Sequence, residues 1–561
     1  MNDTIKNAIL ALWNIDAPVT VTRPNPEFGD YATNVALQLA GKLGKNPRDI
    51  AAELVDKLRE SDTFSEVTVA GPGFINFRVS GASLAHRLNN EWTDSYGNNN
   101  DGQGKTVVVE YPSPNMAKPY SVGHLRTGNQ GWAARQLMLA SGWHVITDNH
   151  LGDYGAPLGI WITGFRHFSN DEALEKDGVY ELGRVYIKTR QALKDEAARG
   201  EHALADEVQS WLLRYEQNDP EAVAYSKRFS EISMQHIHDI MNRLHISTDY
   251  ELGEAFFAPK GKEAVQTLLK KGVAVQNEDG SIIVPLEDMG FDVPLLVQKS
   301  NGAALYATTD LATLLYREQN WHPDRVIYSV GAEQKFYFSQ LFAMAKKLGI
   351  DTELIHLWFG TIDQVNEDGT REKMSSRKGV VLMEELLNEA ERRARDIVKG
   401  RDVSEEDIKK IALGAIKFSD FVSDRRTNIA FNWNTIFALT GVSGPYVQYA
   451  AVRVNKILRD NGNGVPLAEH YDYAAEKDVI AKLLEFPGVV RRAAQQIEPH
   501  QVANYLYDLA RELNRYYEAT PVATKEVPAD IHEARLGVLA KASAVFTRGL
   551  AILGIEVPHQ M

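Results

Sequence analysis

The sequence predicts an α/β nucleotide-binding core between a small N-terminal α+β module and an all-α C-terminal module. Three observations predict this organisation. A β-branched run at 106–111 is followed by a loop, a helical stretch and a second strand, which is the pattern of a parallel α/β unit. A polar linker rich in Gly and Asn precedes it at 95–104. From about Met383 the spacing of apolar residues is helical to the end.

Residues 1–94 are expected to form the N-terminal module. Apolar spacing there predicts two helices, and alternation predicts two strands joined by a tight turn. We expect Asp30 to cap a helix at its N-terminus. The expected elements are helices at 31–43 and 50–58, strands at 66–69 and 74–79, and a turn at 71–73.

Residues 105–385 are expected to form the core, and 386–561 the helical module. The core begins with a strand at 106–111, a helix over about 122–140 and a strand at 143–147. A charged helical insertion over about 166–244 interrupts it. Further core strands are expected at 293–297, 325–330 and 355–360.

Composition excludes several classes of protein. The chain has 561 residues, with 44% apolar and 24% charged residues, which excludes a disordered or fibrous protein. It has no cysteine, so disulfides, thiol catalysis and Cys-ligated zinc are excluded. Because we find no apolar run of roughly 18 residues and no basic leader, we expect a soluble cytoplasmic protein without a signal peptide.

The charge is acidic and unevenly distributed. The formal net charge of −14 argues by itself against a nucleic-acid partner, because phosphate binding favours a basic surface. However, residues 171–250 hold 10 basic and 16 acidic residues, whereas residues 401–561 hold 19 and 20. The C-terminal module is therefore nearly neutral, and the overall acidity does not exclude RNA as its partner.

The segment 110–126 follows the first buried strand, at the position where open α/β sheets bind ligands. Gly123 permits close approach of the backbone, and His124 falls in the first helical turn, where free N–H groups and the helix dipole favour phosphate. Lys118 adds a mobile positive charge. The same pattern also fits an ordinary loop with a surface histidine.

The segment 371–379 reads Arg-Glu-Lys-Met-Ser-Ser-Arg-Lys-Gly, in which four of the nine residues are basic. A solvated surface turn is one interpretation. The other is a loop that closes over a polyphosphate, where cations would stabilise charge on an α-phosphate and a leaving pyrophosphate.

Together, these two segments resemble the two signatures of the class I aminoacyl-tRNA synthetases. The wording Ser-Pro-Asn-Met-Ala-Lys-Pro at 113–119 and Val-Gly-His-Leu-Arg at 122–126 is similar to the arginyl branch. Segment 371–379 resembles the second signature, Lys-Met-Ser-Lys. The chain departs from the family at Ser121, where a histidine is usual, and at Ser376, which replaces the last lysine of the signature. The family's compensating lysine matches Lys118.

The resemblance implies a Rossmann-like class I catalytic core and a set of site residues within it. In the family, a tyrosine and an acid that match Tyr306 and Asp310 hold the arginine side chain, together with an acid that matches Glu254. Two carboxylates suit a guanidinium, which is always charged and offers five donors. By itself, the Tyr306–Asp310 spacing also fits a capped helix start. The implied arginine-binding residues are Ser113, Asn115, Glu254, Tyr306, Asp310 and Gln334. The implied catalytic and ATP-binding residues are Lys118, Ser121, Gly123, His124, Gly331, Lys373, Met374, Ser375 and Ser376.

The resemblance also covers the flanking modules. Residues 444–453 and the C-terminal end are similar to the anticodon-binding domain of the arginyl family, which implies tRNA contacts at Tyr446, Tyr449, Arg453 and Met561. Tyrosines could stack on unpaired bases, although such a pair is more often core packing. Segments 28–34 and 73–77 are similar to the family's N-terminal domain, which contacts the tRNA elbow.

The activity implied is ATP-dependent ligation of L-arginine to its tRNA through an arginyl-adenylate, with AMP and pyrophosphate as products. The implied partners are arginine, ATP with Mg²⁺ and tRNA, without zinc or a membrane, and we expect a monomer. Two alternatives remain open. One is a related nucleotidyltransferase with a small acceptor, against which the C-terminal module argues. The other is a paralogue that has lost catalysis, which only the departures at Ser121, Pro157 and Tyr337 support.

Overall fold

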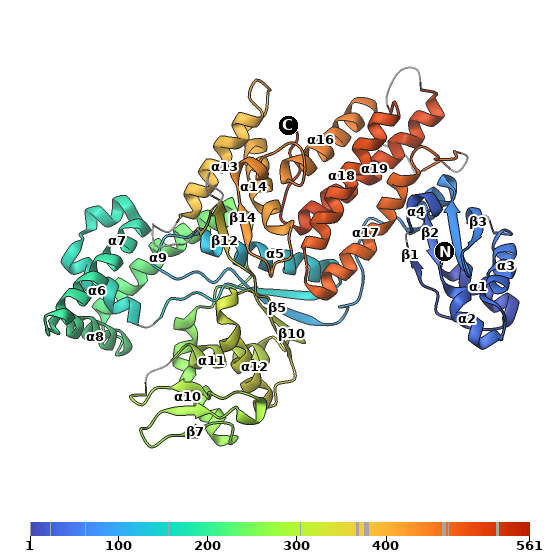
Figure 1. Cartoon of the computed structure of the whole chain (residues 1–561). Helices are drawn as coiled ribbons and strands as arrows, with labels where there is room; N and C mark the ends of the chain where they lie inside the picture. The colour runs from blue at the N-terminus through green and yellow to red at the C-terminus, as the bar shows by residue number, and fades with distance from the viewer. Residues whose placement is uncertain are drawn as a thin grey trace. The chain divides into compact units, whose positions relative to one another are not determined.

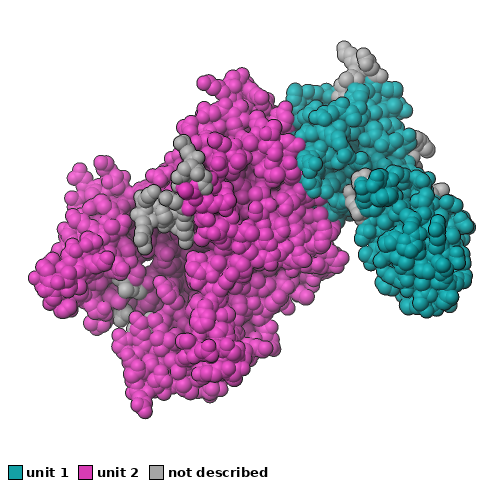
Figure 2. Space-filling view, in the orientation of Figure 1, with its two compact units in different colours: residues 1–96, 450–487, 508–546 teal, residues 97–449, 488–507, 547–561 magenta. Residues whose placement is uncertain are grey.

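The computed structural model describes residues 2–22, 24–61, 63–154, 156–302, 305–365, 370–374, 381–462, 467–468, 471–522 and 527–561. The chain forms two compact units, which Figure 2 shows in different colours. The larger unit contains residues 97–449, 488–507 and 547–561, and the smaller unit contains residues 1–96, 450–487 and 508–546.

A parallel four-stranded sheet forms the centre of the larger unit. Its strands, in the order β11-β10-β5-β6, are Glu353–His356, Arg325–Tyr328, Thr106–Glu110 and His144–Asp148. Each neighbouring pair is parallel, so the carboxyl ends of all four strands lie at one edge. The run Val107–Val109 is fully buried, as expected of a strand covered on both faces.

Helices cover both faces of this sheet (Figure 1). The helix α5 (Leu125–Ala140) connects β5 to β6 and packs against them. On the other face, α11 (Tyr306–Asn320) and α12 (Lys335–Leu348) bury Leu311 and Leu341 against the sheet in one apolar core. The predicted α/β core is confirmed.

The charged stretch after β6 is helical, as predicted. It contains α6 (Ala156–Phe168), α7 (Asp171–Ala198), α8 (Ala203–Glu216) and α9 (Pro220–Arg243). The helix α7 bends at Gly178, whose φ of 53° is not helical.

The remaining elements of the larger unit surround the sheet. They are the short 3₁₀ turns η2 (Val122–His124), η3 (Glu287–Met289) and η4 (Ala332–Gln334), the helices α10 (Glu254–Lys270), α13 (Met383–Ile397), α14 (Glu405–Phe421) and α15 (Trp433–Ile436), and the strands β7 (Val275–Gln276), β8 (Ile282–Val284), β9 (Leu295–Gln298), β12 (Ile362–Val365), β13 (Arg371–Lys373) and β14 (Ile429–Phe431). Four long helices contribute residues to both units: α16 (Gly444–Asn461), α17 (Lys477–Gln496), α18 (His500–Ala519) and α19 (Ala529–Ile552). The all-α character predicted for the C-terminal module is confirmed.

The smaller unit contains an antiparallel sheet in the order β1-β2-β4-β3. Its helices α1 and α3 pack together, and α3 packs against β3. The elements of its N-terminal part are α1 (Asn2–Trp13), β1 (Val21–Thr22), η1 (Pro26–Phe28), β2 (Tyr31–Thr33), α2 (Val35–Leu43), α3 (Pro47–Leu58), β3 (Phe64–Ala70), β4 (Phe74–Val79) and α4 (Gly81–Glu91). This arrangement is the α+β module that the sequence predicts.

Several local predictions were wrong. The segment 293–297 is not a core strand, because β9 pairs antiparallel with β8 in a separate three-stranded sheet. The strand expected at 355–360 ends at His356. Asp30 does not cap a helix: its carboxylate accepts the Val79 N–H at 2.8 Å and binds the Lys477 ammonium at 2.6 Å.

The polar segment 95–104 is ordered, although its composition predicts a linker. The Asn99 N–H donates to the Ala140 carbonyl and the Gly102 N–H to the Ser141 carbonyl, both at 2.8 Å. Arg491 forms two hydrogen bonds to Asp101, at 2.7 and 2.8 Å. Within the described ranges, no helix is long and apolar enough to span a bilayer.

Candidate active site

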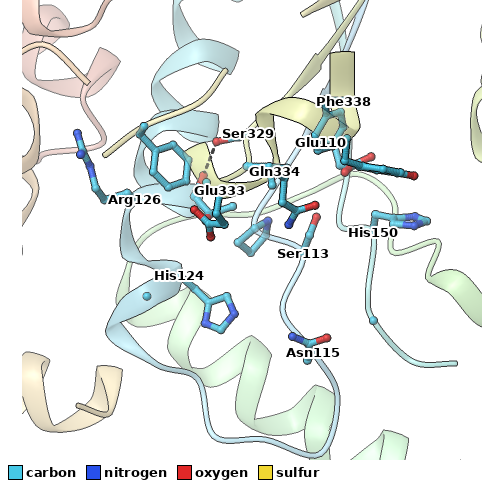
Figure 3. A pocket seen from close by; sticks show the side chains of 18 of the residues that line it. Glu110, Ser113, Asn115, His124, Arg126, His150, Ser329, Glu333, Gln334 and Phe338 are labelled. Carbon is cyan, nitrogen blue, oxygen red and sulfur yellow. Dashed lines mark hydrogen bonds between the residues drawn. The ribbon is translucent and has the colours of Figure 1, made fainter. Parts of the chain in front are cut away.

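A cavity of about 810 Å³ opens at the carboxyl ends of β5 and β10. Figure 3 shows His124 and Arg126 at one side of it and Glu110 and His150 at the other, with Ser113 and Gln334 between them. Most of the residues predicted for arginine and ATP line this one cavity: Ser113, Asn115, Ser121, Gly123, His124, Glu254, Tyr306, Asp310, Gly331, Gln334 and Met374.

The loop that follows β5 is fastened to the segment after β6. The Ser113 N–H donates to the Asn149 side-chain oxygen at 3.1 Å, and the Met116 N–H donates to the Gly152 carbonyl at 3.1 Å. The insertion helix α9 holds the second half of the loop, because Ser233 accepts the Ala117 N–H at 2.8 Å. The loop is therefore held on two sides, which fixes Ser113 and Asn115 at the cavity wall.

His124 ends the turn η2 and directly precedes α5. Its Nδ1 lies 3.2 Å from the Ser121 hydroxyl. Burial lowers the pKa of His124, the Ser121 backbone opposes this shift, and the charge of Lys118 adds to it; the net lowering favours the neutral imidazole at pH 7. If the Ser121 hydroxyl donates to Nδ1, the proton of the ring lies on Nε2, where it can donate to a phosphate oxygen. The residue that departs from the family pattern thus contacts the signature histidine.

Lys118 does not line the cavity. Its ammonium lies 4.9 Å from the ring centroid of Tyr186 in α7. Burial lowers the pKa of Lys118, and the charge of Arg190 lowers it further. The insertion therefore contributes the immediate surroundings of this lysine.

The second signature reaches the cavity at Met374. Strand β13 pairs antiparallel with β12, with Lys373 opposite Asp363. Met374 follows, is buried and lines the cavity. The side chain of Lys373 and the residues Ser375 and Ser376 lie outside the described part of the chain.

The far end of the cavity carries the predicted carboxylates. The Tyr337 hydroxyl donates to Asp310. Burial raises the pKa of Asp310, and it raises the pKa of Glu254 to about 7, with Asp310 adding to the latter shift. Tyr306, expected to face the same way as Asp310, is 69% exposed at the rim. The cavity thus has an acidic end that suits a bound cation.

A buried ion pair lies beneath this acidic end, and the sequence prediction missed it. Arg317 is fully buried, and its Nη2 donates to Glu110 at 2.7 Å and to Asp148 at 2.8 Å. Arg317 follows Asp310 by seven residues in α11, so both lie on one helical face. The seven-residue spacing of Asp310 and Arg317 is the sequence feature that could have identified Arg317 as a residue near the site. Arg317 pairs with the carboxylates of Glu110 and Asp148, so those of Asp310 and Glu254 can pair with another cation.

His150 and Tyr337 were also missed as site residues. From the sequence, neither of them is assigned a role in the site. His150 lines the cavity next to Asp310, with its Nε2 3.7 Å from the carboxylate. Only the packing of the segment after β6 against α11 and α12 brings these side chains together.

One arginine connects the two signatures. Arg126 in α5 donates to Asp420 at 2.9 Å and to the carbonyls of Gly360 and Thr427, both also at 2.9 Å. Gly360 lies just before β12, which pairs with the signature strand β13. Arg126 therefore joins the helix that follows His124, the segment leading to the second signature, and α14.

The residues predicted to contact tRNA lie outside this cavity. Tyr446 packs at 5.6 Å between ring centroids against Tyr507, and Tyr449 is 40% exposed. Arg453 lies 4.2 Å from the ring centroid of Tyr517. The backbone oxygen of Met561 accepts a hydrogen bond from Arg401 at 2.9 Å.

Three family models match the chain. The class I tRNA synthetase (R) catalytic domain matches residues 89–433, the arginyl-tRNA synthetase N-terminal domain matches residues 1–79, and the DALR anticodon-binding domain matches residues 447–561.

Curated relatives match over nearly the full chain. An arginine–tRNA ligase of Chloroflexus aggregans is 33% identical and covers 99% of this chain and 98% of its own. One from Clostridium kluyveri is 34% identical, with the same two coverages. Among solved structures, Thermus thermophilus arginyl-tRNA synthetase has a TM-score of 0.80 at 25% identity, covering 100% of this chain and 99% of its own.

Proposed function

Because the chain belongs to the arginyl-tRNA synthetases of class I, we propose that it joins L-arginine to its tRNA at the cost of ATP. The observation that carries the proposal is the single cavity between His124 and Met374 at one side and Asp310 and Glu254 at the other. It accommodates a phosphate next to a helix start and a cation next to two carboxylates. Those are the two charged ends of an arginyl-adenylate.

In the first step, the arginine carboxylate attacks the α-phosphorus of ATP in line, and pyrophosphate leaves. No side chain needs to act as a covalent nucleophile, so catalysis consists of positioning and electrostatic stabilisation. We assign His124 Nε2–H and the backbone around Gly123 to the phosphates, with Lys373, Ser375 and Ser376 as further donors, and Gly331 and Met374 to the nucleotide. Lys118 would join these donors by turning from Tyr186 towards the cavity.

The amino acid would be held at both ends. Ser113, Asn115 and Gln334 line the middle of the cavity and suit the α-amino and carboxylate groups. Asp310 and Glu254 would pair with the guanidinium, and Tyr306 would close over it from the rim. A lysine ammonium would leave acceptors unpaired here, and such mismatches reject a competing substrate by about 10⁴-fold.

In the second step, a terminal ribose hydroxyl of the tRNA attacks the adenylate carbonyl and releases AMP; for class I we expect the 2′-OH. Tyr446, Tyr449, Arg453 and Met561 are the candidates for anticodon contacts. Exposed Tyr449 is the clearest of these, because single-stranded RNA is bound by stacking on accessible rings.

Mg²⁺ would enter with ATP. Within the described ranges, no group of three or more metal-ligating side chains could hold such an ion. The ion would offset phosphate charge.

We further propose a cytoplasmic monomer. Light scattering of the purified protein would test the monomeric state.

The proposal is tested by ATP–pyrophosphate exchange with each amino acid, with and without tRNA. We expect exchange with arginine only, and only when tRNA is present. Exchange with another amino acid would contradict the assigned specificity. No exchange at all, with intact fold, would favour a paralogue that has lost catalysis.

A further inference from the structure

His150 lines the acidic end of the cavity, and the proposed reaction gives it no role. Its side chain is only 9% exposed, and its ring packs 5.6 Å from that of Phe257. Figure 3 shows it on the same side of the cavity as Glu110. Nδ1 lies 3.0 Å from the Leu252 carbonyl, and Nε2 lies 3.7 Å from an Asp310 oxygen.

The position of the ring protons follows from these two neighbours. A carbonyl oxygen only accepts, so Nδ1 must carry a hydrogen. A neutral ring would then direct the lone pair of Nε2 towards a carboxylate, and both groups would be acceptors. That Nε2 is buried and has no hydrogen-bond partner among the residues that the structure describes. A proton between Nε2 and Asp310 removes this conflict.

The surrounding charges favour that proton. Burial opposes a charged His150, and so does Arg317, but Glu110, Asp310 and Asp148 outweigh them and raise the histidine pKa. Asp153 and Glu254 also face His150 and feel its charge. On the other side of Asp310, Tyr337 donates to the second carboxylate oxygen.

We propose that His150 is a positioning residue for arginine: in the empty cavity it shares one proton with Asp310, and the substrate guanidinium displaces that proton to solvent. This inference rests on the proposed function. The incoming cation supplies the positive charge that the proton supplied before, so the net charge of the acidic end stays constant. Arginine would therefore bind a carboxylate already held in place.

Two substitutions separate the parts of this role. Asn in place of His150 can still donate to the Leu252 carbonyl, but it has no hydrogen-bond donor at the position of Nε2, next to Asp310. Gln can place an amide N–H near the position of Nε2 without a titratable proton. His144→Asn is the matched control, because His144 is exposed and lies in the same strand–loop segment.

In a tRNA-charging assay at pH 7, we expect His150→Asn to raise KM for arginine by about tenfold, with kcat within about threefold. His150→Gln should stay within about threefold of the parent protein in both constants. A purely structural role would instead lower the amount of active enzyme and change kcat for all substrates alike.

The proton itself is observed by NMR of the full chain labelled at histidine ¹³Cε1. The His150 resonance is the one that His150→Gln removes. We expect it to titrate above the ordinary histidine pKa in the free protein. Saturating arginine, with or without tRNA, should lower that pKa by about one unit or more.

A His150 resonance that is neutral from pH 6 to 8, or that ignores arginine both with and without tRNA, overturns the inference. If arginine charging persists in that case, the proposed function stands. If the parent protein does not charge arginine at all, the proposed function itself fails.

Discussion

At the scale of single residues, Tyr337 departs from the residue usual in the family, and its contacts indicate what the tyrosine does. From the sequence alone, it is one of three departures that would support a paralogue without catalysis. In the structure its hydroxyl donates to Asp310, at the acidic end of the cavity. Ser121, another departure, contacts the Nδ1 of His124. Both substitutions place a hydroxyl where it can form a hydrogen bond to a neighbouring site residue.

Asp310→Asn should raise KM for arginine by about 100-fold or more while KM for ATP changes less than about threefold. The amide cannot offer two acceptors to the guanidinium, and it lacks the negative charge. Steady-state charging with each substrate varied in turn measures this. Tyr337→Phe serves as the comparison and should cost less, since it removes one hydrogen bond and no charge. An equal increase of KM for arginine and for ATP would contradict the role of Asp310 in binding arginine.

The pH dependence should follow Glu254. Because its pKa is raised to about 7 in the empty cavity, it becomes protonated as the pH falls through 7 and can no longer pair with a cation. KM for arginine should therefore rise by up to about tenfold per pH unit below 7 and level off above it. Glu254→Gln should raise KM and remove this part of the profile, leaving the contribution of His150 and Asp310. A KM independent of pH between 5.5 and 8 would exclude this behaviour.

At the scale of elements, the position of the site follows from a strand and the helix after it. The loop that follows β5 is held by the segment after β6 and by α9. Directly after the signature histidine His124, the helix α5 begins. The sequence predicts this unit because a continuous β-branched run indicates a strand buried on both faces, and a helical stretch follows it. It does not predict β9 correctly, since a short apolar run looks alike in parallel and antiparallel sheets.

The buried link between α5 and α14 should matter for stability. Asp420→Asn should lower the free energy of unfolding by about 3 kcal/mol, because it leaves the Arg126 guanidinium buried without a counter-charge. Asp424→Asn is the matched control. Its partner Arg426 is largely exposed, so the change should cost less than about 1 kcal/mol. Denaturant unfolding of the two variants measures the difference, and similar losses would argue against the link.

At the scale of the whole molecule, the C-terminal residues of the larger unit return to the catalytic core. The amine of Lys417 in α14 is fully buried, close to Trp132 of α5 and to Gly554 near the end of the chain. It has no hydrogen-bond partner in the described structure. The chain therefore places an unpaired amine where three distant segments meet.

Lys417→Met should stabilise the protein near neutral pH. Burial lowers the pKa of Lys417 to about 7, against the opposing effect of Asp420, whereas the unfolded chain keeps an ordinary lysine. Between pH 7 and about 10 the unfolded state binds the extra proton, so the stability of the parent protein rises with pH in this range. The variant should gain about 2 °C or more in Tm at pH 7 and lose that slope. Thermal scans at pH 7 and 9 test this, and a lower Tm would show that the amine is satisfied.

The sequence by itself determined the α/β core, the helical C-terminal part and the segments that carry chemistry. These features are encoded locally, in periodicity, in strand ends and in residues within a few positions of one another, as in the signature around His124. Most of the residues that it predicted for arginine and ATP line the cavity. Only the tertiary structure decided that Arg317, His150 and Tyr337 surround the predicted acid Asp310, and that Lys118 packs against the insertion. The physical reason is that the charge state of a buried carboxylate depends on neighbours from other elements, and sequence spacing does not reveal those neighbours.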